Sequence, residues 1–112
     1  MEYYEPLPMG RAELEASIES GNQSAITKAL LSAAFYDPDW RWVQGICLRF
    51  LDHTDPIVRW YAACCISHIA RIHEVLDLDL VLPKLLSLRT DAAMGAYIEE
   101  VMEDIRRWIR VQ

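Results

Sequence analysis

The most constraining feature of this sequence is a segment that occurs twice, 18 residues apart. Residues 37–42 read Asp-Pro-Asp-Trp-Arg-Trp, and residues 55–60 read Asp-Pro-Ile-Val-Arg-Trp. A second correspondence, 36 residues apart, places residues 54–71 on residues 90–107. About 18 residues make one helix with its turn, and twice that length makes a helical hairpin. A fixed period of this size is typical of solenoids, in which each hairpin buries its apolar side against the next.

The spacing of apolar residues is helical almost throughout the chain. Asp37-Pro38 and Asp55-Pro56 each place a capping carboxylate ahead of a proline at the first helical position. Asp91 is a further candidate cap. We therefore predict six helices, near residues 11–20, 23–36, 38–52, 56–73, 80–88 and 92–110.

Short connections between these segments predict antiparallel hairpins over residues 11–36, 38–73 and 80–110. Pro83 fits the fifth helix only within its first turn, because proline donates no backbone N–H. We accordingly expect an all-α fold, a short α-solenoid, with residues 1–112 forming one domain.

The charge of the chain restricts its partners. Seventeen acidic and 11 basic residues give a net charge of −6. This balance argues against direct binding of nucleic acid over a broad surface and is compatible with a basic protein partner. The longest apolar run, residues 60–66, is far short of the roughly 20 residues that span a bilayer. The acidic N-terminal segment has no apolar stretch of the kind found in signal peptides.

The cysteines and histidines do not predict a reaction. Cys47, Cys64 and Cys65 are odd in number and partly adjacent, which favours free core thiols in a reducing cytoplasm. Cys64 and His68 share a helical face, but two ligands do not make a tetrahedral metal site. Ser67 and His68 point about 100° apart on a helix, which excludes a local catalytic pair. We expect no catalysis, metal or cofactor.

The Asp-Pro-x-x-Arg elements predict a structural ladder. Asp37 and Arg41 lie one helical turn apart, as do Asp55 and Arg59. In a stack of hairpins each arginine is placed to pair with its own aspartate or with the cap of the neighbouring hairpin, such as Asp91. Paired charges of this kind are usually solvated or architectural.

The last predicted helix has an apolar stripe opposite a run of acidic residues. Two interpretations remain open: a solvated outer face, and an acidic face that recognises a partner. Like charges four residues apart are mildly unfavourable, which favours the second interpretation. The candidate recognition residues here are Glu99, Glu100, Glu103 and Asp104.

Tryptophans and glycines provide two further expectations. Trp42 and Trp60 align in the repeat and are predicted to stack side by side near Asp39, forming an aromatic patch for a partner.

Gly45 and Gly95 each lie inside a predicted helix, where glycine costs about 1 kcal/mol relative to alanine. We favour close approach of helices as the reason, over a bare backbone patch for a partner.

The segment Asp-Pro-x-Val-Arg at residues 55–59, followed by YAACCISHIARI and by VLPKLL at 81–86, resembles a HEAT-type helical repeat. The resemblance covers about residues 37–110 and implies a right-handed stack of hairpins. The 36-residue spacing is closer to that of tetratricopeptide repeats, but the Trp/Leu-Gly/Tyr signature of those repeats is missing.

Residues 55–73, 76–86 and 98–105 are similar to short HEAT-like bacterial proteins that serve as immunity proteins for polymorphic or contact-dependent growth-inhibition (CDI) toxins. This resemblance implies a non-enzymatic, cytoplasmic protein that neutralises a basic toxin domain, commonly a nuclease, by occlusion in a 1:1 complex. A general HEAT scaffold for a host protein or peptide, and an accessory lyase-like HEAT protein, remain alternatives.

Overall fold

The computed structural model describes residues 6–109, and this part of the chain is all helical. The predicted all-α class and the six predicted helices are confirmed, with ends that differ by a few residues. None of the helices in the described part is long and apolar enough to cross a membrane. The helices are α1 (Arg11–Ile18), α2 (Gln23–Tyr36), α3 (Trp40–Phe50), α4 (Pro56–His73), α5 (Leu78–Ser87) and α6 (Gly95–Trp108).

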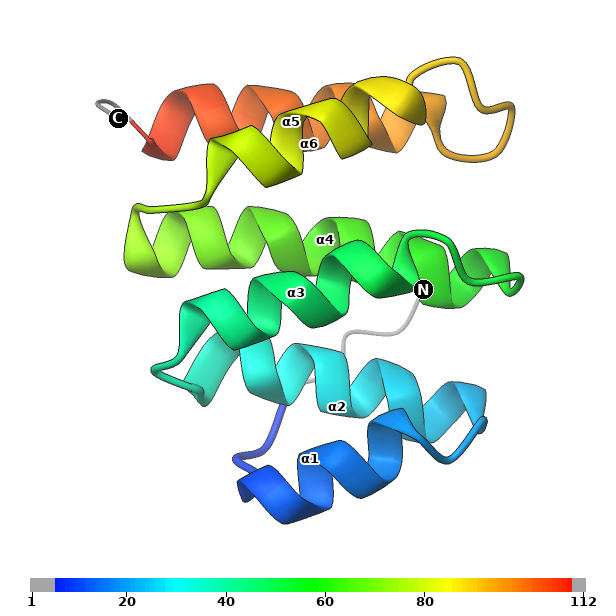
Figure 1. Cartoon of the computed structure of the whole chain (residues 1–112), viewed down its shortest axis with the longest axis vertical. Helices are drawn as coiled ribbons and strands as arrows, with labels where there is room; N and C mark the ends of the chain where they lie inside the picture. Colours follow the sequence, from blue (N-terminus) through cyan, green and yellow to red (C-terminus); the bar gives the residue numbers. More distant parts are fainter. Residues whose placement is uncertain (1–5, 110–112) are drawn as a thin grey trace.

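The helices form three pairs, stacked in chain order along the longest axis of the molecule (Figure 1). α2, α4 and α6 make one layer, in which α4 packs against both of its neighbours. α1, α3 and α5 lie on the other side of the stack and pack on α2, α4 and α6, respectively. The middle helix α4 is therefore the element that links all three pairs.

Small side chains let α2 and α4 pack closely, since short side chains reduce the distance between helix axes. The buried alanines are Ala29, Ala33 and Ala34 of α2, and Ala62, Ala63 and Ala70 of α4. Larger side chains fill the core around this contact, and the largest fully buried ones include Leu30, Ile66, Ile69, Leu85 and Ile98.

The start of α4 is as predicted, whereas the start of α3 is not. Asp55 caps α4 through a bond from the Ile57 N–H, and Pro56 is the first helical residue. The prediction that Asp37 caps α3 is wrong. The Asp37 carboxylate instead accepts the N–H of Asp39 at 2.8 Å, and Asp39 accepts the N–H of Trp42. Because these two bonds form successive turns ahead of the helix, α3 begins only at Trp40.

α5 and α6 also begin at other positions than predicted. α5 starts at Leu78, so Pro83 lies in its interior and not in its first turn. Pro83 is exposed, which allows solvent to replace the missing backbone hydrogen bond. α6 starts at Gly95, because Asp91 caps a separate turn by accepting the N–H groups of Ala93 and Met94.

Only one of the two helical glycines marks a close approach. A Cβ added at Gly95 would lie 2.7 Å from the carbonyl oxygen of Arg89. A Cβ added at Gly45 would meet no heavy atom within 4 Å, so the predicted close approach at that position is wrong.

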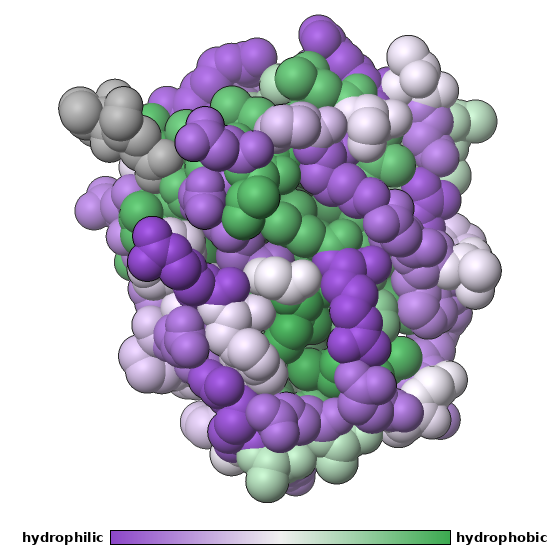
Figure 2. Space-filling model, in the orientation of Figure 1, coloured by the Kyte–Doolittle hydropathy of each residue, from purple (hydrophilic) through white to green (hydrophobic). Residues whose placement is uncertain are grey.

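The face formed by α1, α3 and α5 is mostly hydrophilic, with apolar patches between the polar side chains (Figure 2). Two of the exposed large apolar side chains, Leu80 and Leu86, belong to α5. Scattered apolar exposure of this kind is normal for a protein surface.

Candidate functional site

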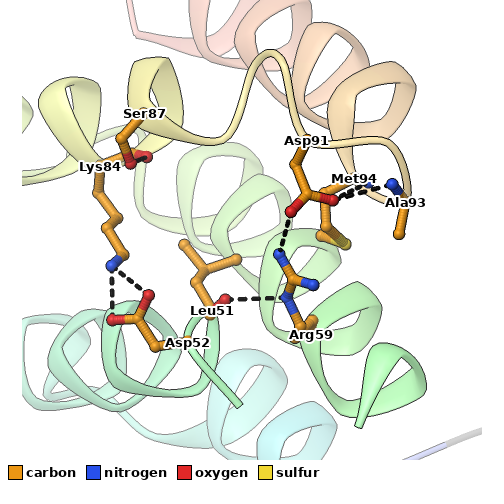
Figure 3. A network of polar contacts seen from close by, with 8 residues as sticks. All are labelled: Leu51, Asp52, Arg59, Lys84, Ser87, Asp91, Ala93 and Met94. Carbon is orange, nitrogen blue, oxygen red and sulfur yellow. Dashed lines mark hydrogen bonds and ion pairs between the residues drawn. The ribbon is translucent and has the colours of Figure 1, made fainter. Parts of the chain in front are cut away.

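Arg59 joins three parts of the fold (Figure 3). Its Nη2 donates to Oδ2 of Asp91 at 3.0 Å, and its Nε donates to the Leu51 carbonyl at 3.2 Å. Of the two pairings predicted for this arginine, the structure has the one with the cap of the neighbouring hairpin. The Arg59 bond, aided by the backbone N–H groups of Ala93 and Met94, lowers the pKa of Asp91.

The corresponding pairing at the earlier element does not form. Asp37 and Asp39 both pair with Arg11 of α1, at 3.4 and 3.7 Å. Arg41 lies instead over the ring of Trp40, with its guanidinium carbon 4.7 Å from the centroid. The predicted ladder of Asp37 and Arg41 is therefore wrong, because the α1 arginine takes the carboxylate.

The predicted stack of Trp42 on Trp60 is wrong. The Arg11 guanidinium covers Trp42, at 3.6 Å from the ring centroid. Trp60 lies on α4 and makes edge contacts with Tyr61 and Tyr97, at centroid distances of 5.1 and 5.7 Å. The two tryptophans therefore belong to different surfaces. Asp39 lies beside Trp42, because it accepts the Trp42 backbone N–H and pairs with the same Arg11.

The four acidic residues of α6 divide into two edges. Glu99 pairs with Arg89 at 2.6 Å, and Glu103 pairs with Arg106 at 2.5 Å, and these two form the paired edge. Glu100 and Asp104 have no ion pair with any residue in the described part of the chain, and they form the unpaired edge. The negative charge of the helix is thus neutralised locally on one edge and left open on the other.

The unpaired edge lines a cleft of about 180 Å³ between α4 and α6. We refer to it as the α4–α6 cleft. Its apolar and aromatic walls carry hydroxyl, thiol, imidazole and carboxylate groups side by side. The lining residues are Trp60, Cys64, Ser67, His68, Tyr97, Glu100, Val101 and Asp104.

Burial keeps the titratable groups of α4 neutral in this cleft. The pKa of His68 is lowered to about 4, first by burial and then by the positive charge of Arg71. Arg71 lies 3.3 Å from Nδ1 of His68, and arginine only donates, so Nδ1 accepts and the ring proton resides on Nε2. Burial and the carboxylates of Glu100 and Asp104 raise the pKa of Cys64 to about 11.

At neutral pH the cleft therefore carries two carboxylates, a neutral imidazole and a protonated thiol. A nucleophilic cysteine requires a lowered pKa, so Cys64 has the opposite of the required environment. Within the described ranges, no group of three or more histidine, cysteine, aspartate or glutamate side chains is arranged to hold a metal ion. The arrangement is suited to binding through charge and aromatic contact.

The repeat could have revealed this cleft, although each candidate on α4 looked like a core or surface residue when considered alone. The 36-residue offset aligns Cys64 with Glu100 and His68 with Asp104. Residues at equivalent positions on adjacent helices of one layer lie beside each other. The 36-residue offset was therefore the sequence signal for the cleft. Its use required the knowledge that α4 and α6 are neighbours.

Comparison with known proteins agrees with the fold and gives it a family. No family model matches the chain, and no curated protein matches it. A crystal structure of a CDI complex from Cupriavidus taiwanensis LMG 19424 contains a chain of 32% sequence identity and TM-score 0.86. The match covers 99% of this chain and 99% of that chain. The chain described here therefore belongs to the family represented in that complex, the immunity-like proteins of contact-dependent growth inhibition.

Proposed function

We propose that this protein is the immunity protein of a CDI system and that it neutralises a cognate toxin domain by covering that domain's active or substrate-binding surface. The observation that carries the proposal is the match over nearly the whole of both chains to a component of a CDI complex. The protein acts in the cytoplasm as a monomer in a 1:1 complex, with residues 1–112 forming one short, right-handed HEAT-like domain.

The charge of the chain supports a nuclease as the toxin. An enzyme that binds a nucleic acid presents basic groups to phosphates. A net charge of −6 complements such a surface and accelerates association with it. Glu100 and Asp104, the carboxylates of the unpaired edge, stand on a helix that is anchored in the core through Ile98, Val101 and Ile105. A rigid helix presents these charges with little entropic cost of ordering on binding.

The chemistry of the α4–α6 cleft supports inhibition by binding and not by reaction. Its thiol and its imidazole are held in the neutral, unactivated state at pH 7. α4 packs against both α2 and α6, and this layer provides a rigid support for a contact surface. Occlusion requires only this stable, complementary surface.

Co-expression with the toxin domain encoded directly upstream tests the proposal. We expect a complex that co-purifies at 1:1 stoichiometry by native mass spectrometry, and toxin activity on RNA or DNA that falls to background at one molar equivalent. Raising the salt concentration should slow association, because screening weakens electrostatic steering. A toxin domain from an unrelated CDI system is the control and should remain active. Failure to form a complex, or full toxin activity within the complex, would contradict the proposal.

A further inference from the structure

Resting on the proposed function, we infer that the α4–α6 cleft is the anchor point for the toxin and that its occupant is an arginine side chain of the toxin. The guanidinium ion pairs with the carboxylates of Glu100 and Asp104 and lies against the aromatic rings of Trp60 and Tyr97.

Local charge distinguishes the cleft from the rest of α6. Arg89 and Arg106 already neutralise Glu99 and Glu103 on the paired edge. Glu100 and Asp104 have no such partner in the described part of the chain, and like charges four residues apart repel each other. A cation placed between them relieves that repulsion, so these two carboxylates gain more from an external cation than the paired edge does.

The size and walls of the cleft fit one side chain. Its volume of about 180 Å³ is below the roughly 300–1,000 Å³ of small-molecule pockets. Trp60 and Tyr97 meet edge to face at its wall, with their ring centroids 5.7 Å apart. Arginine combines a forked set of donors for carboxylates with a planar group that stacks on aromatic rings, and lysine lacks this plane.

Trp60 supplies a second, independent feature. Its Nε1 is fully buried and has no acceptor among the described residues. A buried donor without an acceptor is rare, because it loses its bonds to water without replacement. Protein atoms cover this N–H in the free chain, so a backbone carbonyl of the toxin would accept it only after binding shifts the Trp60 ring or the side chains that cover it. The free protein thus has an unused donor on a residue that lines the cleft, and a toxin that uncovers it gains a hydrogen bond.

The groups that face the cleft from α4 do not oppose a cation. His68 is neutral at pH 7, and the Cys64 thiol is protonated. The positive side chain in contact with His68 is Arg71, and it also lies over Phe35 at 5.7 Å from the ring centroid. The charges that act on the Cys64 thiol are those of the two carboxylates.

Two double variants with the same change in net charge test the inference. E100Q/D104N removes the unpaired edge, and E99Q/E103Q removes the paired edge of the same helix. Because long-range steering changes equally in both, the association rates should fall together. The dissociation rate should rise only for E100Q/D104N, and its Kd for the toxin domain should increase on the order of 100-fold. The Kd of E99Q/E103Q should stay within about threefold of wild type.

Trp60→Phe removes the N–H and keeps an aromatic ring. The Nε1–H resonance that disappears in this variant identifies Trp60 in the NMR spectrum, and we expect it to move downfield when the wild-type protein binds the toxin. The affinity of Trp60→Phe should fall about five- to tenfold. Exchanging toxin arginines singly for lysine should reveal one whose loss is not additive with E100Q/D104N.

The possible failures are distinguishable. Three results would overturn the inference that the cleft anchors the toxin, while leaving the proposed function intact. They are equal dissociation rates for the two double variants, an unmoved Trp60 resonance, and the absence of any coupled toxin arginine. A wild-type protein that does not bind the toxin would overturn both. Circular dichroism and the urea midpoint verify that each variant is folded.

Discussion

The guanidinium of Arg59 reaches the carboxylate of Asp91, 32 residues further along the chain, at 3.0 Å. The same side chain bonds to the carbonyl of Leu51 at the end of α3. One side chain therefore fixes the connection before its own helix and the turn that leads into α6. Both partners are partly buried, with side-chain exposures of 18% for Arg59 and 30% for Asp91, so water screens this contact less than a surface pair.

Arg59→Ala should destabilise the protein clearly. The lost bond to the Leu51 carbonyl alone is worth on the order of 1–2 kcal/mol, and the loss of the packed aliphatic stem adds to it. Urea unfolding followed by circular dichroism measures the change. Arg49→Ala is the matched control, because its pair with Glu19 is exposed on both sides and should contribute about 0.5 kcal/mol or less. Equal effects of the two substitutions would contradict the structural role of Arg59.

The two helical glycines should respond in opposite directions to alanine. Gly45→Ala places a methyl group in open space and should stabilise the protein by about 0.5–1 kcal/mol. Gly95→Ala drives a Cβ to 2.7 Å from the Arg89 carbonyl and should destabilise it, since backbone must move. Thermal unfolding of both variants provides the comparison. Stabilisation by Gly95→Ala would show that the turn before α6 is looser than described.

His68 should make the protein less stable as the pH falls through the range from about 6.5 to about 4. The unfolded chain binds a proton near the ordinary pKa of 6.5, whereas the folded protein resists protonation until its pKa of about 4. The stability is therefore full above pH 6.5 and is lost as the pH falls toward 4. The free energy of unfolding should fall by on the order of 2 kcal/mol. This is less than the full pKa shift would give, because water reaches part of the ring.

His68→Gln provides the measurement for this effect. Its unfolding free energy, followed by urea titrations at several pH values, should change much less between pH 6.5 and 4 than that of wild type. His73→Gln, at the end of the same helix, should keep the wild-type slope. A wild-type profile that is flat in this range would show that the imidazole is more solvated than its position implies.

Cys64 should react slowly with alkylating reagents. A pKa of about 11, against an ordinary value of 9.0, reduces the thiolate fraction at pH 8 by about 100-fold. Mass spectrometry of iodoacetamide-treated protein measures the rate at this residue. Because Glu100 and Asp104 contribute to the raised pKa, E100Q/D104N should react faster, whereas E99Q/E103Q should not. A wild-type rate close to that of a free thiol would mean that neither burial nor the two carboxylates raise the pKa of Cys64.

Local sequence signals determined the helices where they agreed with one another. At residues 55–56 a capping aspartate, a proline at the first helical position and an apolar period all mark the same helix start, and α4 begins there. At residues 37–42 the same signals predicted Asp37 as the cap, but a second aspartate, Asp39, follows two residues later. The structure decides between them, because the Asp37 carboxylate accepts the N–H of Asp39 and Asp39 accepts the N–H of Trp42 at the start of α3.

The candidate site was likewise only partly predictable from the sequence. The acidic composition of α6 was visible in the sequence, but its separation into a paired and an unpaired edge was not. That separation depends on where Arg89 and Arg106 point and on the position of Cys64 and His68 on the adjacent helix.

By itself, the sequence determined the all-helical class, the order and approximate length of the helices, the strong acidity and the resemblance to CDI immunity proteins. The class, the helices and the acidity depend on periodicity, capping and composition, which act within about one helical turn or over the whole chain, whereas the resemblance rests on the residues of particular segments. Only the tertiary structure decided which charges are neutralised, which tryptophan has an unused N–H and which residues share a cleft. Electrostatics and burial depend on distances between helices, and those distances exist only after the helices have packed.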